Sequence, residues 1–397
     1  MSEAAVPDVR LRVGIAGLGQ AGSALVPAVL RHPHAAITAV ADPRQDVREA
    51  FARDFPVEPH AGIESLCASA SVDLVYIATP THLHAAHALL ALAHGKHVIV
   101  EKPMALTLDE ADAMITEAER RRLHLIVGHS QSCEPPIRAM RDLVREGTIG
   151  RLRMMHTWYY GDWLYRPRTP EELDSVRGGG VLFRQGAHQV DLLRWIGGGL
   201  VRSVRAATAS WDPARPTEGA HTLFLDFADG TAATAVYSGY DHFNTAELTA
   251  ADEDGRPFEP RRHARARSAL RASGPAGEAA LKQSLGYASA PSDPGQGQPQ
   301  SHFYGLTVVS CERGDIRQVP GGLRVYGDDR QWDVPISPDR TGRDNLLAEA
   351  YEAVVNGRPP PHDGRWGKAN LEVCLAALES SRTRREVQLH RQVPTPD

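Results

Sequence analysis

Cysteine is scarce in this 397-residue chain, which holds only Cys67, Cys133, Cys311 and Cys374. The four lie far apart and form no Cys-x-x-Cys pair. Because zinc sites and disulfide frameworks need closely spaced or paired cysteines, this spacing argues against both. We therefore expect no metal centre, and we expect reduced, mostly buried thiols of a cytoplasmic protein.

Long apolar runs and an excess of positive charge are also absent. No apolar run reaches the roughly 20 residues that span a bilayer, and the first ten residues lack the apolar core of a secretory signal. Lys and Arg number 44 against 49 Asp and Glu, a formal net charge of −5. Since non-specific nucleic-acid binding needs a basic surface, we expect neither a membrane nor a nucleic-acid partner.

The composition, with 42% apolar and 23% charged residues, is that of a globular protein of about two or three domains. Residues 1–130 alternate short apolar strands with helices, which predicts a doubly wound parallel sheet, the Rossmann type of α/β fold. Thr107 and Glu110 have capping-box spacing at the start of one helix. The expected strands are 11–16, 37–41, 74–78, 97–100 and 123–127, and the expected helices are 21–31, 44–55, 83–93 and 107–122.

Residues 131–397 change to strands with alternating apolar residues, such as Leu223, Leu225 and Phe227. Asp229-Gly230 is typical of a hairpin between two of these strands. The pattern predicts an α+β domain with a mainly antiparallel sheet. The expected strands are 151–160, 201–210, 221–227, 231–240, 304–311 and 323–326, and the expected closing helices are 345–356 and 366–384.

Residues 251–300 do not fit this second domain. They contain a run of arginines at 261–267 and then a stretch rich in Gly, Pro, Ser and Gln, without a sustained apolar period. We interpret them as a partly mobile insertion. The arginine run is either a solvated charged loop, which we favour, or an anion contact.

The first chemical motif is Gly17-Leu-Gly-Gln-Ala-Gly22, which matches G-x-G-x-x-G directly between a strand and a helix. Gly17 permits the tight turn, Gly19 lets a pyrophosphate approach the backbone, and Gly22 lets helix and strand pack closely. The helix N-terminus would present free N–H groups to the phosphates. The alternative is a glycine-rich turn in another kind of α/β protein.

Asp42 ends the second expected strand. A carboxylate there accepts hydrogen bonds from a ribose diol and repels a 2′-phosphate, which favours NAD over NADP. Arg44 is close enough to receive a 2′-phosphate, so NADP remains an alternative. An Asp-Pro turn at Asp42-Pro43 would also explain the aspartate.

Thr79-Pro80 and Glu101-Lys102-Pro103 follow two further strands, at the edge of the sheet where doubly wound folds bind ligands. Beside a nicotinamide, Lys102 could polarise a hydroxyl or carbonyl and stabilise a developing alkoxide. The alternative is a solvated surface lysine. The expected cofactor contacts are Gly17, Gly19, Gln20, Ala21, Gly22, Asp42, Arg44, Thr79, Pro80, His82, Glu101 and Lys102.

A second motif, at 178–191, begins with three glycines and runs into an expected helix at 187–196. His188 lies at the start of that helix. Histidine can take and return a proton near neutral pH. Taken alone His188 would be structural, but together with Lys102 and a nicotinamide site it is a catalytic candidate.

The order of these motifs resembles the glucose-fructose oxidoreductase / inositol dehydrogenase / rhizopine-catabolism (Gfo/Idh/MocA) family, over nearly the whole chain outside the insertion. The resemblance implies a Rossmann domain followed by an α+β domain with a large open sheet. It also implies a tightly held NAD(P), with Lys102 and His188 as catalytic residues. Since an open sheet with one apolar face needs covering, we expect a homodimer or homotetramer.

One departure from the family pattern concerns the substrate. The position four residues before the histidine, commonly an aspartate in the family, is Arg184 here. Arginine suits a carboxylate or phosphate through a bidentate contact. Arg166 is either a second anion contact or a surface arginine. The expected substrate contacts are His129, Arg166, Arg184 and His188.

Several stretches, among them His129-Ser-Gln-Ser132 and His362-Asp-Gly-Arg-Trp366, are similar to the 4,5-dihydroxyphthalate (phthalate dihydrodiol) dehydrogenase branch. That branch implies NAD-dependent oxidation of a carboxylated cis-dihydrodiol, such as 4,5-dihydro-4,5-dihydroxyphthalate, to a catechol. Two vicinal carboxylates would account for Arg184 and Arg166. The alternatives are a sugar or nucleotide-sugar (UDP-glucose-type) dehydrogenase, an NAD-binding sensor and an NAD-dependent glycoside hydrolase.

Overall fold

A computed structural model describes residues 9–128, 131–249, 263–284, 286–287 and 304–396. The chain divides into two compact units. Unit 1 consists of Met1–Gly128, Ser284–Ala290 and Arg343–Lys368, and unit 2 consists of His129–Gln283, Pro291–Gly342 and Ala369–Asp397. The chain therefore enters unit 1 three times, instead of leaving it once near residue 130 as the sequence pattern suggests.

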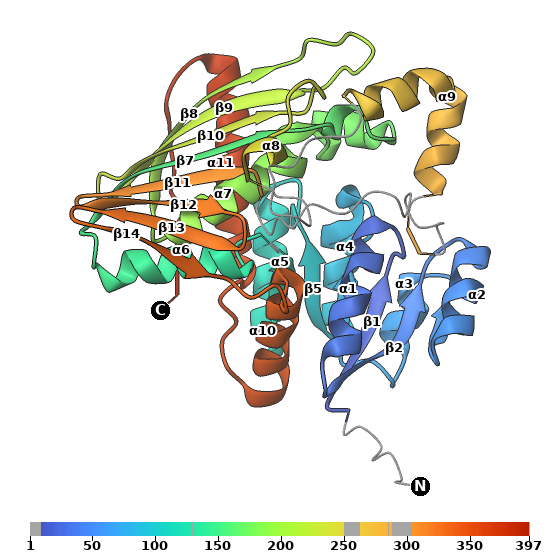
Figure 1. Cartoon of the computed structure of the whole chain (residues 1–397). Coiled ribbons are helices and arrows are strands. Elements are labelled where there is room, and N and C mark those ends of the chain that lie inside the picture. Colours follow the sequence, from blue (N-terminus) through green and yellow to red (C-terminus); the bar gives the residue numbers. More distant parts are fainter. Residues whose placement is uncertain (1–8, 129–130, 250–262, 285, 288–303, 397) are drawn as a thin grey trace, which may run out of the picture. The chain divides into compact units, whose positions relative to one another are not determined.

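Unit 1 is built on a six-stranded parallel sheet in the order β3-β2-β1-β4-β5-β6 (Figure 1). All residues of β4 and β6 are buried, which places apolar cover on both faces of the sheet, as expected for a parallel sheet. The strand order reverses between β1 and β4, the topological switch point of the Rossmann fold. The strands are β1 Leu11–Ala16, β2 Ala35–Ala41, β3 Glu58–His60, β4 Leu74–Ile77, β5 His97–Glu101 and β6 Leu125–Gly128.

Helices connect these parallel strands, because a parallel pair needs a crossover. The predicted capping box of α5 is present: Thr107 Oγ1 accepts from Glu110 N at 3.1 Å, and Glu110 Oε2 accepts from Thr107 N at 3.2 Å. The helices are α1 Gln20–Arg31, α2 Gln45–Asp54, α3 Ile63–Ala68, α4 His84–Ala93, α5 Leu108–Arg121 and α10 Gly342–Asn356, with a short turn at Thr81–Leu83.

Unit 2 contains a nine-stranded sheet in the order β14-β13-β12-β11-β7-β10-β9-β8-β15. Neighbouring strands are antiparallel except for β7 and β10. The Asp229-Gly230 turn joins β9 to β10 as predicted, with Gly230 at φ +87°. The strands are β7 Leu152–Tyr160, β8 Val201–Ala209, β9 Ala220–Phe227, β10 Ala232–Ser238, β11 Leu306–Cys311, β12 Gly314–Val319, β13 Gly322–Gly327, β14 Gln331–Pro335 and β15 Val387–Gln388.

The two faces of the unit 2 sheet differ, as the alternating pattern of β9 predicts. Leu223, Leu225 and Phe227 are buried, whereas the intervening Phe224 is 47% exposed. On the buried face, Gln189 of α7 donates to the Val236 carbonyl at 3.0 Å. The longer helices are α6 Pro135–Glu146, α7 Ala187–Ile196, α9 Arg265–Gln283 and α11 Gly364–Thr383, with α8 at Ala246–Thr249 and short helical turns at 163–165, 171–173, 175–177 and 182–186.

Part of the predicted insertion is helical. Its residues 265–283 form α9, whose two halves meet at a kink where Gly274 has φ +63°. Arg267 is not a solvated loop residue: its backbone N–H donates to Asp241 Oδ2 at 3.0 Å, and its guanidinium lies 4.6 Å from the Tyr165 ring centre. Residues 251–262, 285 and 288–300, and with them Arg261, lie outside the described residues.

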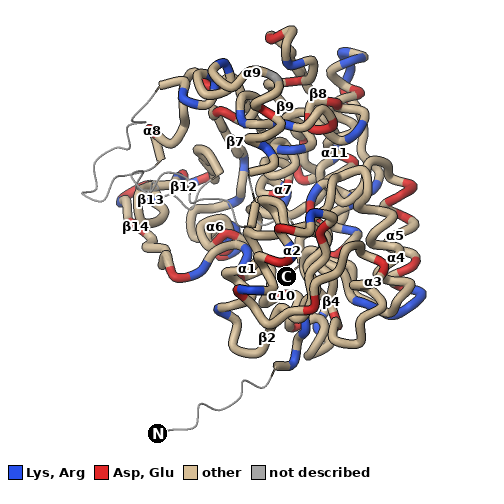
Figure 2. Tube along the Cα trace, turned by 90° about the vertical axis from the view of Figure 1, so that its right-hand side faces the viewer, with Lys and Arg blue, Asp and Glu red and all other residues tan. Residues whose placement is uncertain are grey.

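Charges of both signs are interspersed along the chain (Figure 2). Cys67, Cys133 and Cys374 are buried free thiols, and Cys311 is half-buried. Within the described residues, no helix is both long and apolar enough to span a membrane.

Candidate active-site residues and cofactor domain

The glycine-rich loop has the geometry that its sequence predicts. Gly17 has φ +94°, and a Cβ on Gly22 would lie 1.8 Å from the Gly17 carbonyl oxygen. A Cβ on Gly19, by contrast, would meet nothing within 4 Å. Two glycines therefore let α1 begin tightly against β1, and the third leaves open space over the loop.

Asp42 ends β2 and organises the neighbouring loop. Its Oδ2 accepts from Leu18 N at 2.8 Å, and Arg44 Nε donates to its Oδ1 at 2.9 Å. Burial raises the pKa of Asp42, but the bonds from Arg44 and Leu18 outweigh it, so the net pKa is lower than usual. Asp42 is thus an ionised carboxylate, and Arg44 is its ion-pair partner.

The loops after β4 and β5 are linked through one buried histidine. His84 lies within 2.9 Å of the Thr79 carbonyl oxygen through Nε2 and within 2.8 Å of the Pro103 carbonyl oxygen through Nδ1. The Thr79 hydroxyl lies 2.9 Å from His87 Nδ1. His84, to which we assigned no role from the sequence, therefore holds together the two loops that carry Thr79 and Lys102.

The other predicted cofactor residues lie on or beside these loops. Gln20 and Ala21 begin α1, Pro80 precedes the Thr81–Leu83 turn and His82 lies within it. Glu101 ends β5 and accepts a hydrogen bond from the Tyr76 hydroxyl. Lys102 follows as a half-buried residue.

A segment of the insertion docks against the glycine-rich loop of unit 1. The Tyr287 N–H donates to the Leu18 carbonyl at 3.0 Å, and the Tyr287 ring centre lies 4.4 Å from that of Phe51. A Cβ on Gly286, whose φ is +131°, would lie 2.8 Å from the Leu18 oxygen. No sequence pattern predicts this contact, because Gly286-Tyr287 lies in a stretch without periodicity.

In unit 2, His188 lies at the start of α7, directly after a π-helical turn at Leu182–Gly186. Its ring centre is 5.1 Å from that of Tyr304, which in turn packs 4.6 Å from Tyr159. Burial raises the pKa of both tyrosines, so both stay neutral. Neither tyrosine was among the residues predicted from the sequence; both lie on the same side of the sheet as His188.

Arg184 belongs to a charge cluster centred on Glu172. Glu172 accepts from Arg184 at 3.4 Å, from Arg168 at 3.3 Å and from Lys282 at 2.9 Å. Burial alone raises the pKa of Glu172, but Arg168, Arg184 and Lys282 together lower it to about 2. Three cations thus surround one carboxylate that is only 12% exposed.

Arg166 is placed differently. Its guanidinium pairs with Asp162 at 2.7 Å, and its side chain is 48% exposed. Arg166 also lies near Tyr159, whose pKa it lowers against the larger effect of burial. His129, the fourth expected substrate contact, lies outside the described residues.

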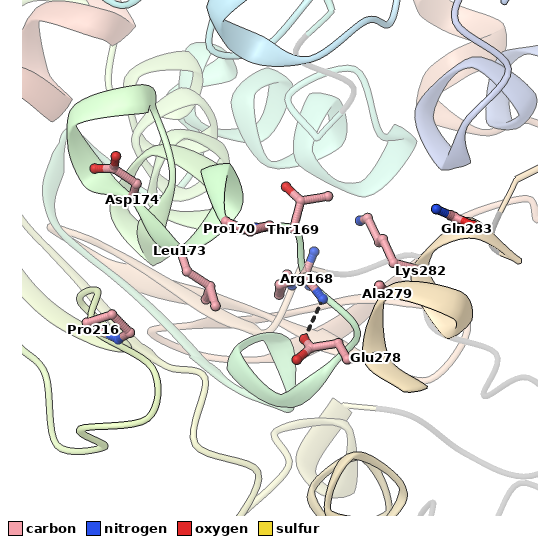
Figure 3. Close-up of a pocket in the computed structure, with 10 residues that line it drawn as sticks. All are labelled: Arg168, Thr169, Pro170, Leu173, Asp174, Pro216, Glu278, Ala279, Lys282 and Gln283. Carbon is pink, nitrogen blue, oxygen red and sulfur yellow. Dashed lines mark hydrogen bonds between the residues drawn. The ribbon is translucent and has the colours of Figure 1, made fainter. Parts of the chain in front are cut away.

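A cavity of about 610 Å³ adjoins the Glu172 cluster within unit 2 (Figure 3). Arg168 and Lys282 line it, together with Glu278, which accepts from the Arg168 N–H at 2.8 Å. Leu173 and Pro216 contribute apolar side chains to the lining of the cavity. Its volume is in the range of small-molecule binding sites.

Comparison with known proteins identifies the family. Residues 11–129 match the family described as "Oxidoreductase family, NAD-binding Rossmann fold", and residues 137–255 match the GFO/IDH/MocA C-terminal domain. A 1-carboxy-3-chloro-3,4-dihydroxycyclohexa-1,5-diene dehydrogenase from Comamonas testosteroni is 38% identical over 378 residues, 94% of this chain and 95% of the relative. The chain belongs to the Gfo/Idh/MocA oxidoreductase family.

Solved structures of this family share the whole fold. The crystal structure of a protein from Bordetella bronchiseptica RB50, described as a dehydrogenase, matches this chain with a TM-score of 0.88 at 41% identity. The match covers 96% of this chain and 100% of that one. An Agrobacterium radiobacter oxidoreductase, in complex with NAD+, L-tartaric acid and magnesium, has a TM-score of 0.69 at 20% identity, covering 96% and 98%; this likeness concerns the fold alone.

This Gfo/Idh/MocA protein is an oxidoreductase with an NAD-binding Rossmann domain. The unit 1 loops fit that cofactor, because Gly19 leaves room for a pyrophosphate and Asp42 is an ionised carboxylate at the end of β2.

Proposed function

We propose that the protein oxidises a carboxylated cyclic cis-dihydrodiol, of the 4,5-dihydro-4,5-dihydroxyphthalate type, to the corresponding catechol with NAD. The single observation that supports this most is Arg184, which lies about one helical turn before His188 and pairs with Glu172, a carboxylate that two further cations also contact. The carboxylated dihydrodiol named for the Comamonas relative is of the same class.

In this proposal His188 and Lys102 have separate roles in the reaction. His188 takes the proton of the reacting hydroxyl, and the Lys102 ammonium polarises that oxygen and stabilises the alkoxide. Bound NAD supplies the hydride acceptor. Loss of one hydride and one proton leaves a ring ketone, which tautomerises to the aromatic catechol.

Arg184 binds and orients the carboxylate. Arg184 lies in the π-helical turn, four residues and roughly one helical turn before His188, so the proposal places both residues at the substrate. The π-helical turn that holds Arg184 runs directly into α7, which fixes this relation. A carboxylate held by Arg184 would set which ring carbon meets His188.

Two Arg184 variants test the proposal. A charge-assisted contact contributes about 1.5–3 kcal/mol, so Arg184→Ala should lower kcat/KM for a carboxylated dihydrodiol roughly 10- to 150-fold. A neutral dihydrodiol should lose much less, and Arg184→Asp should shift relative preference further toward neutral polyols. Equal losses on both substrates would assign Arg184 to the fold and remove the proposal's main support.

We also propose that the outer face of the unit 2 sheet joins copies of the chain into a homodimer or homotetramer. Met154 and Trp158 of β7 and Phe224 of β9 are 42%, 44% and 47% exposed. Their place on one face of a sheet supports an apolar interface. The enzyme would then act as a homo-oligomer of the cytoplasm.

A further inference from the structure

Three cations from the described part of the chain meet at one carboxylate, that of Glu172. Arg168, Arg184 and Lys282 all contact Glu172, while the nearby Glu278 is paired with Arg215 at 2.8 Å. The cluster is well shielded, since the side chains of Arg168, Glu172 and Lys282 are 7%, 12% and 23% exposed. Cations held close together in a shielded place repel one another, and a bound anion lowers that cost.

Burial and the neighbouring cations both act on the pKa values of Arg168 and Lys282. Burial lowers the pKa of Arg168 to about 10, and the neighbouring Arg166 and Arg184 contribute to the decrease. Burial also lowers the pKa of Lys282, which Glu172 partly restores and Arg168 and Arg184 oppose. An added anion would relieve this repulsion among the cations.

Lys282 is the member of the cluster that comes from the insertion. It lies in the last turn of α9, and it lines the 610 Å³ cavity beside Arg168 (Figure 3). Glu172 also accepts the Thr169 N–H at 2.9 Å, so its carboxylate is held in place from the backbone. The lysine stem is flexible, so its ammonium can turn toward a ligand while Glu172 keeps the two arginines.

We propose that Lys282 is a specificity-determining residue that the insertion helix contributes for a carboxylate group of the substrate. The inference rests on the proposed function. In the chain without substrate, the Lys282 ammonium forms an ion pair with Glu172. When substrate binds, the ammonium also contacts a substrate carboxylate, and Arg184 orients the ring. The insertion thereby makes the enzyme selective for anionic cyclic diols.

Three variants test this role. Lys282→Met removes the charge, Lys282→Arg keeps it, and Arg271→Met removes the same charge from an exposed position on α9. We expect Lys282→Met to lower kcat/KM for a carboxylated cis-dihydrodiol roughly 10- to 150-fold, mainly through KM. Activity on the neutral benzene cis-dihydrodiol should stay within about twofold, Lys282→Arg should retain most of the preference, and Arg271→Met should match the wild type.

The outcomes separate this inference from the proposed function. A wild-type enzyme without preference for the carboxylated substrate would defeat the proposed function itself. A wild-type preference that survives intact in Lys282→Met would overturn the role of Lys282 alone. Equal losses on charged and neutral substrates would also overturn it, because they would show that Lys282 only supports the fold.

Discussion

At the scale of single residues, Asp42 and His84 hold the loops of unit 1 that carry the predicted cofactor contacts. The Asp42 carboxylate accepts hydrogen bonds from the Leu18 N–H and from the Arg44 guanidinium. This one carboxylate therefore positions both the glycine-rich loop and Arg44. The glycine positions, Asp42 and Lys102 were all predicted from the sequence, because each follows directly from a strand end. His84 was not, because its role depends on two carbonyl groups that are distant in sequence.

Replacement of Asp42 tests the cofactor preference. Asp42→Ala removes the negative charge that a 2′-phosphate would face, and it frees Arg44 to bind that phosphate. We expect weaker NAD binding and a smaller discrimination against NADP, measured as the ratio of kcat/KM for the two cofactors. A wild-type enzyme that prefers NADP tenfold would contradict this account of Asp42.

Lys102 should act on the reaction and hardly on cofactor binding. Lys102→Met should lower kcat roughly a hundredfold or more, the usual effect of losing one well-placed electrostatic group. The dissociation constant for NADH, followed by fluorescence titration, should change much less. If turnover stays near normal, Lys102 has no part in the mechanism.

At the scale of helices and strands, the packing of α7 on the unit 2 sheet buries His221 of β9. His221 Nε2 lies 2.9 Å from Gln189 Oε1, while Gln189 Nε2 donates to the Val236 carbonyl. Because Gln189 donates through its nitrogen, its oxygen accepts from His221 Nε2–H. Full burial disfavours the charged form of this ring, so the ring is neutral. Burial lowers the pKa of His221 to about 3.

This depressed pKa predicts a pH-dependent stability. Between about pH 6.5 and 3 the unfolded chain protonates His221 while the folded chain does not, so the free energy of unfolding falls as the pH decreases. The fall should approach about 1.4 kcal/mol per pH unit within that window. Above pH 6.5 the contribution is fully present.

Urea unfolding at several pH values measures this slope. His221→Gln should lack the His221 contribution and show a correspondingly flatter dependence between pH 6.5 and 4.5. His94→Gln, at an exposed position, is the matched control and should retain the wild-type slope. An identical slope in wild type and His221→Gln would contradict the assignment of a neutral buried ring.

The elements that the sequence predicted are those with a strong local signal. Residues close together in the sequence are enough to predict the alternation in β9, the Asp-Gly turn and the Thr107 capping box. The helix α9 lacks such a signal, because Gly274 and Pro275 interrupt its period. The Glu172 cluster was missed for a related reason: it joins residues 168, 172, 184 and 282, which only the folded chain brings together.

At the scale of the whole molecule, the exposed apolar face of the unit 2 sheet predicts self-association. Trp158→Glu places a charge in the proposed interface, where burial without a partner is costly. Light scattering after size-exclusion chromatography should therefore give a lower molar mass for this variant than for the wild type. A monomeric wild type, or a variant with unchanged mass, would exclude this face as the interface.

The central claim is that the enzyme oxidises a carboxylated cyclic dihydrodiol, and the most direct test is NADH formation by the wild-type protein. Purified enzyme with NAD is given a carboxylated cis-dihydrodiol, benzene cis-dihydrodiol, an inositol or a UDP-sugar, and NADH absorbance is followed. We predict steady NADH release with the carboxylated dihydrodiol, at a kcat/KM at least about tenfold above that for the neutral diol, as one charge-assisted contact implies. NADH release with only the inositol or the UDP-sugar, or no net NADH with any of the four, would contradict the claim.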